Sequence, residues 1–88
     1  MVKAFSIRIK INEKETITPC ADRETLYQTL CEDLRKENIT DTDIKDIIKE
    51  FNNKVTDEAL QNISKPIKFN VLNNKVYVEI IDISKDYK

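Results

Sequence analysis

Residues 67–80 read IKFNVLNNKVYVEI, two runs rich in β-branched and aromatic residues that flank Asn73-Asn74. The chain contains no Gly, and Asn is the best substitute where φ must be positive, so this pair suits the two-residue type I′ turn of a hairpin. Pairing outward from the turn places three apolar pairs on one face: Val71 with Val76, Phe69 with Val78, and Ile67 with Ile80. The other face then carries Lys68 with Glu79 and Asn70 with Tyr77. One register satisfies both faces, which predicts an antiparallel hairpin.

The N-terminal segment shows the same alternation, because residues 4–11 read AFSIRIKI. A strict period of two predicts a strand with one buried face. Polar residues 12–14 suit a turn, and residues 15–18 suit a short return strand whose Ile17 faces the core. We expect Pro19 to end that strand, since Pro cannot donate a hydrogen bond to a ladder.

Two helices are expected between these β segments and begin at recognisable caps. Asp22 suits the N-cap of a helix that reaches about Glu37, and Asn38 suits the left-handed position that follows. Thr40 suits the N-cap of the next helix, which we expect Asn52-Asn53 to close. Both segments carry apolar residues at spacings of three and four, which is typical of helices with one buried side.

A third, shorter helix is expected over residues 56–64, with Thr56 as its cap and Pro66 preventing its continuation. The chain therefore has the order β(β)αααββ, an α+β fold with a three- to four-stranded antiparallel sheet and three helices packed on one face. The predicted core consists of Phe5, Ile7, Ile9, Leu26, Leu30, Ile47, Phe51, Phe69, Val71, Val76 and Val78.

Length and composition limit the classes to which the protein can belong. The 88 residues fit a single domain, 1–88, and we expect its polar end, residues 84–88, to be a frayed tail. Apolar runs are too short to span a bilayer, and the alternating N-terminus does not resemble a signal peptide. We therefore expect a cytoplasmic protein without a membrane partner.

The residue types disfavour catalysis and metal binding. The chain lacks His, the commonest general acid or base, and lacks Gly for phosphate-binding loops. Cys20 and Cys31 are expected to be free thiols. A helix N-terminus near Cys20 would lower its pKa, but an incidental thiol is the favoured interpretation of Cys20. Helix-end stabilisation and solvation account for the acidic residues near position 43 better than a calcium loop does. We predict no enzyme, no cofactor, no metal and no small-molecule substrate.

Charge divides the sequence into basic strands and acidic helices. Residues 1–14 carry a net charge of +3, residues 15–64 carry −6, and residues 65–88 carry +2. A solvated helical surface with ordinary cap chemistry accounts for this division most simply, and an acidic helical layer also suits a basic protein partner. Beyond Ile80 the alternation changes phase, so two further Ile side chains would point outward as apolar anchors or as a sheet edge for strand addition. The tentative partner-binding residues are Asp41, Asp43, Asp46, Glu50, Asp57, Glu58, Ile81 and Ile83.

Nucleic acid is the second candidate partner. Three helices followed by a hairpin resemble the winged helix-turn-helix family in outline, with residues 40–52 and 56–64 as the motif and 67–80 as the wing. The resemblance implies DNA binding near Lys65, Lys68 and Lys75. Residues 56–64 hold no basic side chain, however, and duplex binding depends on Lys and Arg.

The exposed face of the sheet is another nucleic-acid candidate, since it carries Arg8, Lys10, Lys68 and Tyr77. The opening hairpin and helix also resemble the start of a ubiquitin-like β-grasp fold, which implies protein binding. The sequence thus favours a small non-enzymatic protein-interaction module, such as an adaptor, a subunit or an inhibitor of phage or plasmid type. A winged-helix-like DNA-binding regulator is the alternative.

Overall fold

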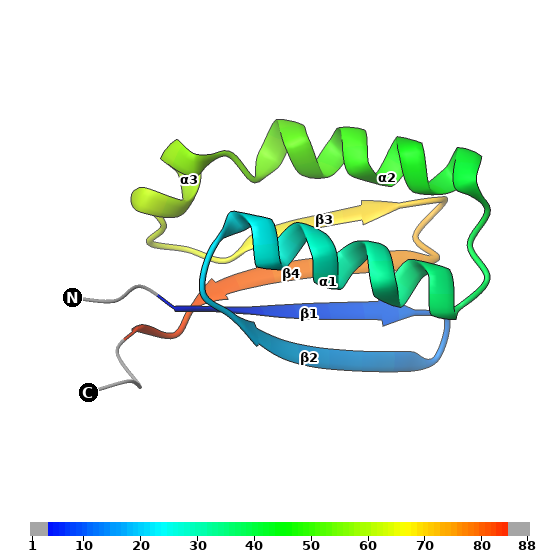
Figure 1. The fold of residues 1–88 in the computed structure, drawn as a ribbon, viewed down its shortest axis with the longest axis horizontal. Helices are drawn as coiled ribbons and strands as arrows, with labels where there is room; N and C mark the ends of the chain where they lie inside the picture. Colours follow the sequence, from blue (N-terminus) through cyan, green and yellow to red (C-terminus); the bar gives the residue numbers. More distant parts are fainter. Residues whose placement is uncertain (1–3, 85–88) are drawn as a thin grey trace.

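The computed structural model describes residues 4–84 and has an α+β fold built on a four-stranded antiparallel sheet (Figure 1). The expected fold class is therefore confirmed, with four strands and three helices. The elements in chain order are β1 (Phe5–Ile11), β2 (Lys14–Cys20), α1 (Arg23–Lys36), α2 (Asp41–Lys54), α3 (Asp57–Gln61), β3 (Ile67–Val71) and β4 (Val76–Asp82).

The strands lie in the order β2-β1-β4-β3, so the first and last strands of the chain form the centre of the sheet. The helices cover one face, with α1 packed over β1 and β2 and α2 packed over β3. No helix of residues 4–84 covers the other face, which we call the open face. None of the helices in the described chain is long and apolar enough to cross a membrane.

The C-terminal hairpin has the register that its sequence predicts. Phe69 lies opposite Val78, and Asn70 lies opposite Tyr77, as expected for two strands joined through Asn73-Asn74. Both turn residues have positive φ, at 53° and 67°, which a type I′ turn requires. Leu72 also has a positive φ of 53°, a conformation that is unfavourable for a branched side chain and that the sequence did not indicate.

The N-terminal hairpin corrects two expectations. Its turn contains two residues, so Ile11 pairs with Lys14 and Ile17 lies opposite Arg8 on the open face. Ile17 is 58% exposed and does not face the core, because a change of one residue in a turn reverses the face of every side chain that follows. Pro19 does not end β2, which continues to Cys20. An edge strand tolerates Pro, since one side of its backbone needs no partner.

All three expected N-caps are present. Asp22 accepts a hydrogen bond from the Thr25 amide at 2.8 Å, and Thr40 and Thr56 accept equivalent bonds in α2 and α3. Asn38 has a φ of 62°, which confirms it as the left-handed residue after α1.

The ends of α2 and α3 differ from expectation. Asn52-Asn53 does not close α2, which runs on to Lys54, because neither asparagine adopts the left-handed conformation that ends a helix. The third helix has five residues, shorter than the expected segment 56–64, and Asn62 is its C-cap.

One hydrophobic cluster lies between the helices and the sheet. Of the predicted core residues, all but Val71 are buried, and Val71 packs against the cluster while partly exposed. The cluster also includes apolar residues outside that list: Ile11, Cys20, Leu34, Ile44, Val55, Leu60 and Ile80.

The predicted tail 84–88 lies outside the described residues except for Ser84. The Ser84 hydroxyl accepts a hydrogen bond from the Ala4 amide at 3.0 Å, and the next residue back, Ile83, donates its amide to the Ala4 carbonyl at 2.9 Å. These bonds extend the pairing of β4 with β1 beyond the last assigned strand residue.

Candidate functional site

A row of four side chains crosses the whole open face. Lys10 on β1 lies opposite Glu15 on β2 and, on its other side, opposite Tyr77 on β4. Tyr77 in turn lies opposite Asn70 on β3. Directly opposed residues of antiparallel strands have Cβ atoms about 4.5–5.5 Å apart, so these four side chains are immediate neighbours.

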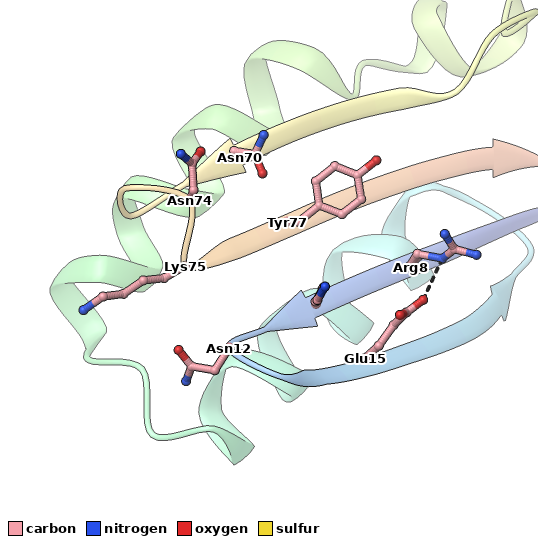
Figure 2. A pocket seen from close by; sticks show the side chains of 8 residues that line it. Arg8, Asn12, Glu15, Asn70, Asn74, Lys75 and Tyr77 are labelled. Atoms are coloured by element: carbon pink, nitrogen blue, oxygen red, sulfur yellow. Dashed lines mark ion pairs between the residues drawn. The ribbon is translucent and has the colours of Figure 1, made fainter.

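This row forms the floor of a shallow depression at the end of the open face where the two hairpin turns meet (Figure 2). The depression has a volume of about 440 Å³ and is lined by polar and charged side chains. Asn12, Asn74 and Lys75 contribute from the turns. The backbone N–H of Asn12 donates to the backbone carbonyl of Lys75 at 3.1 Å. This bond joins the two turns at this end of the site.

Positive charge in the depression is unevenly compensated. The Arg8 guanidinium is paired on both sides, with Glu15 at 2.9 Å and with Glu79 at 3.4 Å. Lys10 and Lys75 are exposed, and within residues 4–84 neither forms an ion pair. Two lysine charges are thus available to an anionic group that enters the depression.

Tyr77 is half-buried and places its aromatic ring on the open face. Figure 2 shows its ring lying flat over the strands, with one face turned outward from the sheet. Desolvation raises the pKa of its hydroxyl above the ordinary value; the charge of Glu79 and a hydrogen bond with that carboxylate raise the pKa further, and Arg8 opposes the shift. Tyr77 is therefore neutral at physiological pH and presents an uncharged aromatic surface.

The far end of the open face is more apolar. Ile81 is 37% exposed and lies opposite Ser6, which lies opposite Pro19 on β2. Ile17 stands next to Pro19 on the same strand face, and its contribution here was missed because it was expected in the core. Counting two residues in the first turn, instead of three, would have placed it correctly.

The two isoleucines proposed as anchors occupy different environments. Ile81 points from an inner strand onto the open face, whereas Ile83 is half-buried just beyond β4. The free edges of the sheet belong to β2 and β3, not to the strand that carries Ile81.

The six acidic candidates lie on the opposite side of the molecule from the open face. All belong to α2 or α3, whose solvent-facing sides we call the acidic layer. Asp41, Asp46, Asp57 and Glu58 are exposed, while Asp43 and Glu50 are half-buried. Glu50 pairs with Lys54 at 3.8 Å within the helix. The structure thus brings these six residues to one side but separates them from Ile81.

Charge is polarised between the two sides of the protein. The helical segment 22–62 contains eleven acidic and six basic residues, a formal charge of −5. The strands and turns of 4–20 and 65–82 contain six basic and four acidic residues, a formal charge of +2. The acidic and basic halves expected from the sequence therefore become opposite faces of the fold.

The lysines of the DNA-binding alternative are dispersed. Lys68 lies on the open face of β3, Lys75 is in the second turn, and Lys65 is in the loop before β3; all three are exposed. Within the described chain, β4 is paired on both sides along most of its length, so residues 67–80 belong to the sheet and do not project as a wing.

Both cysteines are free and buried. The expected lowering of the Cys20 pKa is wrong: burial raises the pKa of this thiol, while a hydrogen bond with Thr29 acts in the opposite direction. Burial also restricts access to reagents, so Cys20 lacks both features of a reactive cysteine. Among residues 4–84, no three His, Cys, Asp or Glu side chains are grouped to hold a metal ion.

Arg23 is an important residue that the sequence did not reveal. Its Nε donates to the Val55 carbonyl at 2.6 Å, and its Nη2 donates to Asn52 Oδ1 at 2.7 Å. The guanidinium also lies 5.3 Å from the centre of the Phe51 ring. Arg23 therefore joins the start of α1 to the end of α2, one of the two helices that carry the acidic layer.

Comparisons with known proteins give no family for this chain. No family model matches it, and searches of curated proteins and of solved structures found no match.

Proposed function

We propose that the chain is a non-enzymatic protein-interaction module that binds a basic partner through its acidic layer. The observation that carries the proposal is the charge polarisation of the fold, with a formal charge of −5 on the helical segment and +2 on the sheet. A surface of this kind attracts and orients a positively charged protein before contact.

The geometry of the acidic layer suits a broad contact. The α2 helix has 14 residues, so it presents a surface about 21 Å long, and α3 continues that surface at its C-terminal end (Figure 1). Acidic side chains recur from the first turn of α2, at Asp41, to the first turn of α3, at Glu58. Within residues 4–84, four of the six acidic candidates form no ion pair and are exposed: Asp41, Asp46, Asp57 and Glu58.

The residue types are consistent with binding in place of catalysis. The chain has no His, and its buried thiol at Cys20 has a raised pKa, which disfavours the nucleophilic thiolate. An adaptor, a subunit of a larger assembly and an inhibitor would all use such a surface.

A pull-down from the source cell with matched variants tests the proposal. The double variant Asp46→Asn, Glu58→Gln removes two charges from the acidic layer, and the control Glu13→Gln, Glu32→Gln removes two charges elsewhere. We expect the wild type and the control to retain the same partner and the acidic-layer variant to lose it.

Purified partner then gives the decisive measurement. Its affinity for the wild type should fall as salt rises, because the exposed charges that steer association are screened. Recovery of background proteins alone, or capture that is equal for both variants, would overturn the proposal.

A further inference from the structure

The depression on the open face combines three features that a protein partner for the acidic layer does not explain. It has two lysines that form no ion pair within residues 4–84, an aromatic ring with one face turned outward, and amide side chains at its rim. From this combination we propose that the open face binds single-stranded nucleic acid, with Tyr77 stacking on a base and Lys10 and Lys75 contacting phosphates.

The position of Tyr77 suits stacking on a base. Tyr77 occupies an inner strand of the sheet, between Lys10 on one side and Asn70 on the other. Glu79, two residues further along the same face of β4, contacts Arg8 at 3.4 Å. Tyr77 is half-buried among these neighbours, so it loses less side-chain entropy on binding than a fully exposed side chain would. A base stacks on an aromatic face regardless of its identity.

Two lysines near the Tyr77 ring are placed to contact phosphates. Arg8 is engaged with Glu15 and Glu79, so among the residues that line the depression Lys10 and Lys75 are the cations that can neutralise phosphates. Lys10 is directly opposite Tyr77, so a nucleotide stacked on the ring places its backbone within reach of that ammonium group. Asn70 and Asn74 each offer both donors and acceptors to the edges of bases.

Shape favours a strand over a duplex or a free nucleotide. The depression is shallow, and its lining residues other than Tyr77 are exposed, so it cannot enclose most of a small ligand as typical cofactor sites do. No helix of the described chain lies on this face, so no recognition helix is positioned there to enter the groove of a duplex. A flat, cationic sheet with a stacking residue suits a strand that passes across it.

The test is fluorescence anisotropy with labelled single strands of about 12 nucleotides, a length within the range that one sheet domain covers. A mixed-sequence DNA and its RNA equivalent are compared with the annealed duplex and with unlabelled mononucleotide as a competitor. We expect both single strands to bind at low salt, the duplex to bind more weakly, and the mononucleotide to compete poorly.

Variants assign the binding to the depression. Tyr77→Ala should weaken binding roughly tenfold to a hundredfold, whereas Tyr77→Phe should keep most of the affinity because the ring is retained. The double variant Lys10→Gln, Lys75→Gln should reduce the slope of log affinity against log salt by about 1.4, because each neutralised phosphate of a single strand accounts for about 0.7 of that slope. The control Lys45→Gln, Lys49→Gln removes two exposed charges from α2 and should change neither quantity.

Several outcomes would overturn the inference. If single strands do not bind at low salt, or if the sheet and α2 lysine variants have equal effects, the depression is not a binding site for single-stranded nucleic acid. Stronger binding to the duplex, or efficient competition by mononucleotide, would show that the ligand class is wrong. Circular dichroism of each variant verifies that the fold is retained. If Tyr77→Ala unfolds, Tyr77→Leu keeps the stacking claim testable, because it removes the aromatic ring but retains an apolar side chain, and it should weaken binding relative to Tyr77→Phe. These results are independent of the acidic-layer proposal, since the two surfaces share no residue.

Discussion

Replacing Arg23 with Ala should destabilise the fold more than replacing an exposed arginine of the same helix, such as Arg35. The guanidinium donates to the Val55 carbonyl at 2.6 Å and lies 5.3 Å from the centre of the Phe51 ring. Val55 is fully buried and is the C-cap of α2, so its carbonyl has few alternative partners. Truncation of the side chain leaves that acceptor poorly satisfied.

The expected magnitude follows from these contacts. A hydrogen bond from a charged donor contributes about 1.5–3 kcal/mol, and a cation–π contact at a partly exposed site contributes about 0.5–1 kcal/mol. The bond to Asn52 is exposed to solvent, so we assign it little additional energy. We expect a loss of about 2–3 kcal/mol in the free energy of unfolding, and a fall in Tm of about 10–20 °C for a chain of this size.

Urea unfolding followed by far-UV circular dichroism measures this loss. Arg35→Ala is the matched control, because Arg35 is an exposed arginine in the last turn of the same helix, where its favourable interaction with the helix dipole amounts to about 0.3–1 kcal/mol. Arg23→Lys should fall between the two, since Lys keeps the charge but lacks the planar fork. Equal losses for Arg23→Ala and Arg35→Ala would refute the claim that Arg23 joins α1 to α2.

Two further predictions test the cap of α1 and the register of the first hairpin. The Thr25 hydroxyl and amide hold the pKa of Asp22 below its ordinary value, so its contribution is present above the unfolded pKa of about 4 and is lost as pH falls through the lower folded pKa. The Tm advantage of the wild type over Asp22→Asn should therefore shrink below about pH 4, and a constant advantage would contradict the assignment. In urea titrations, Ile9→Ala should cost about 2–5 kcal/mol and Ile17→Ala about 0.5 kcal/mol or less, whereas similar costs would place Ile17 in the core.

Local chemistry made much of the fold predictable from sequence. The Asn73-Asn74 turn and the apolar pairs around it fixed the register of β3 against β4, because one alignment satisfied both faces. The caps of the three helices were equally clear, since a capping side chain bonds an amide only three residues away. Such features depend on neighbours in the chain, and their physics is contained in a short segment.

The errors arose where the length of a turn or a residue distant in sequence decided the outcome. Ile17 was placed in the core because it is the apolar residue of β2, but a two-residue turn fixed the opposite parity. The α2 helix continued past its expected end because neither Asn52 nor Asn53 adopts the left-handed conformation, and Arg23, distant in sequence, bonds to Asn52 and Val55 there. Neither outcome is determined by the propensities of the segment itself.

By itself, the sequence determined the α+β class, the C-terminal register, the helix starts and the separation of acidic helices from basic strands. The tertiary structure alone decided that β1 pairs with β4, and this pairing places Lys10 beside Tyr77 and brings the two hairpin turns together. The candidate site on the open face therefore joins residues from opposite ends of the chain. Its formation depends on burial of the common apolar face of the strands beneath the helices, a cooperative event that no local pattern encodes.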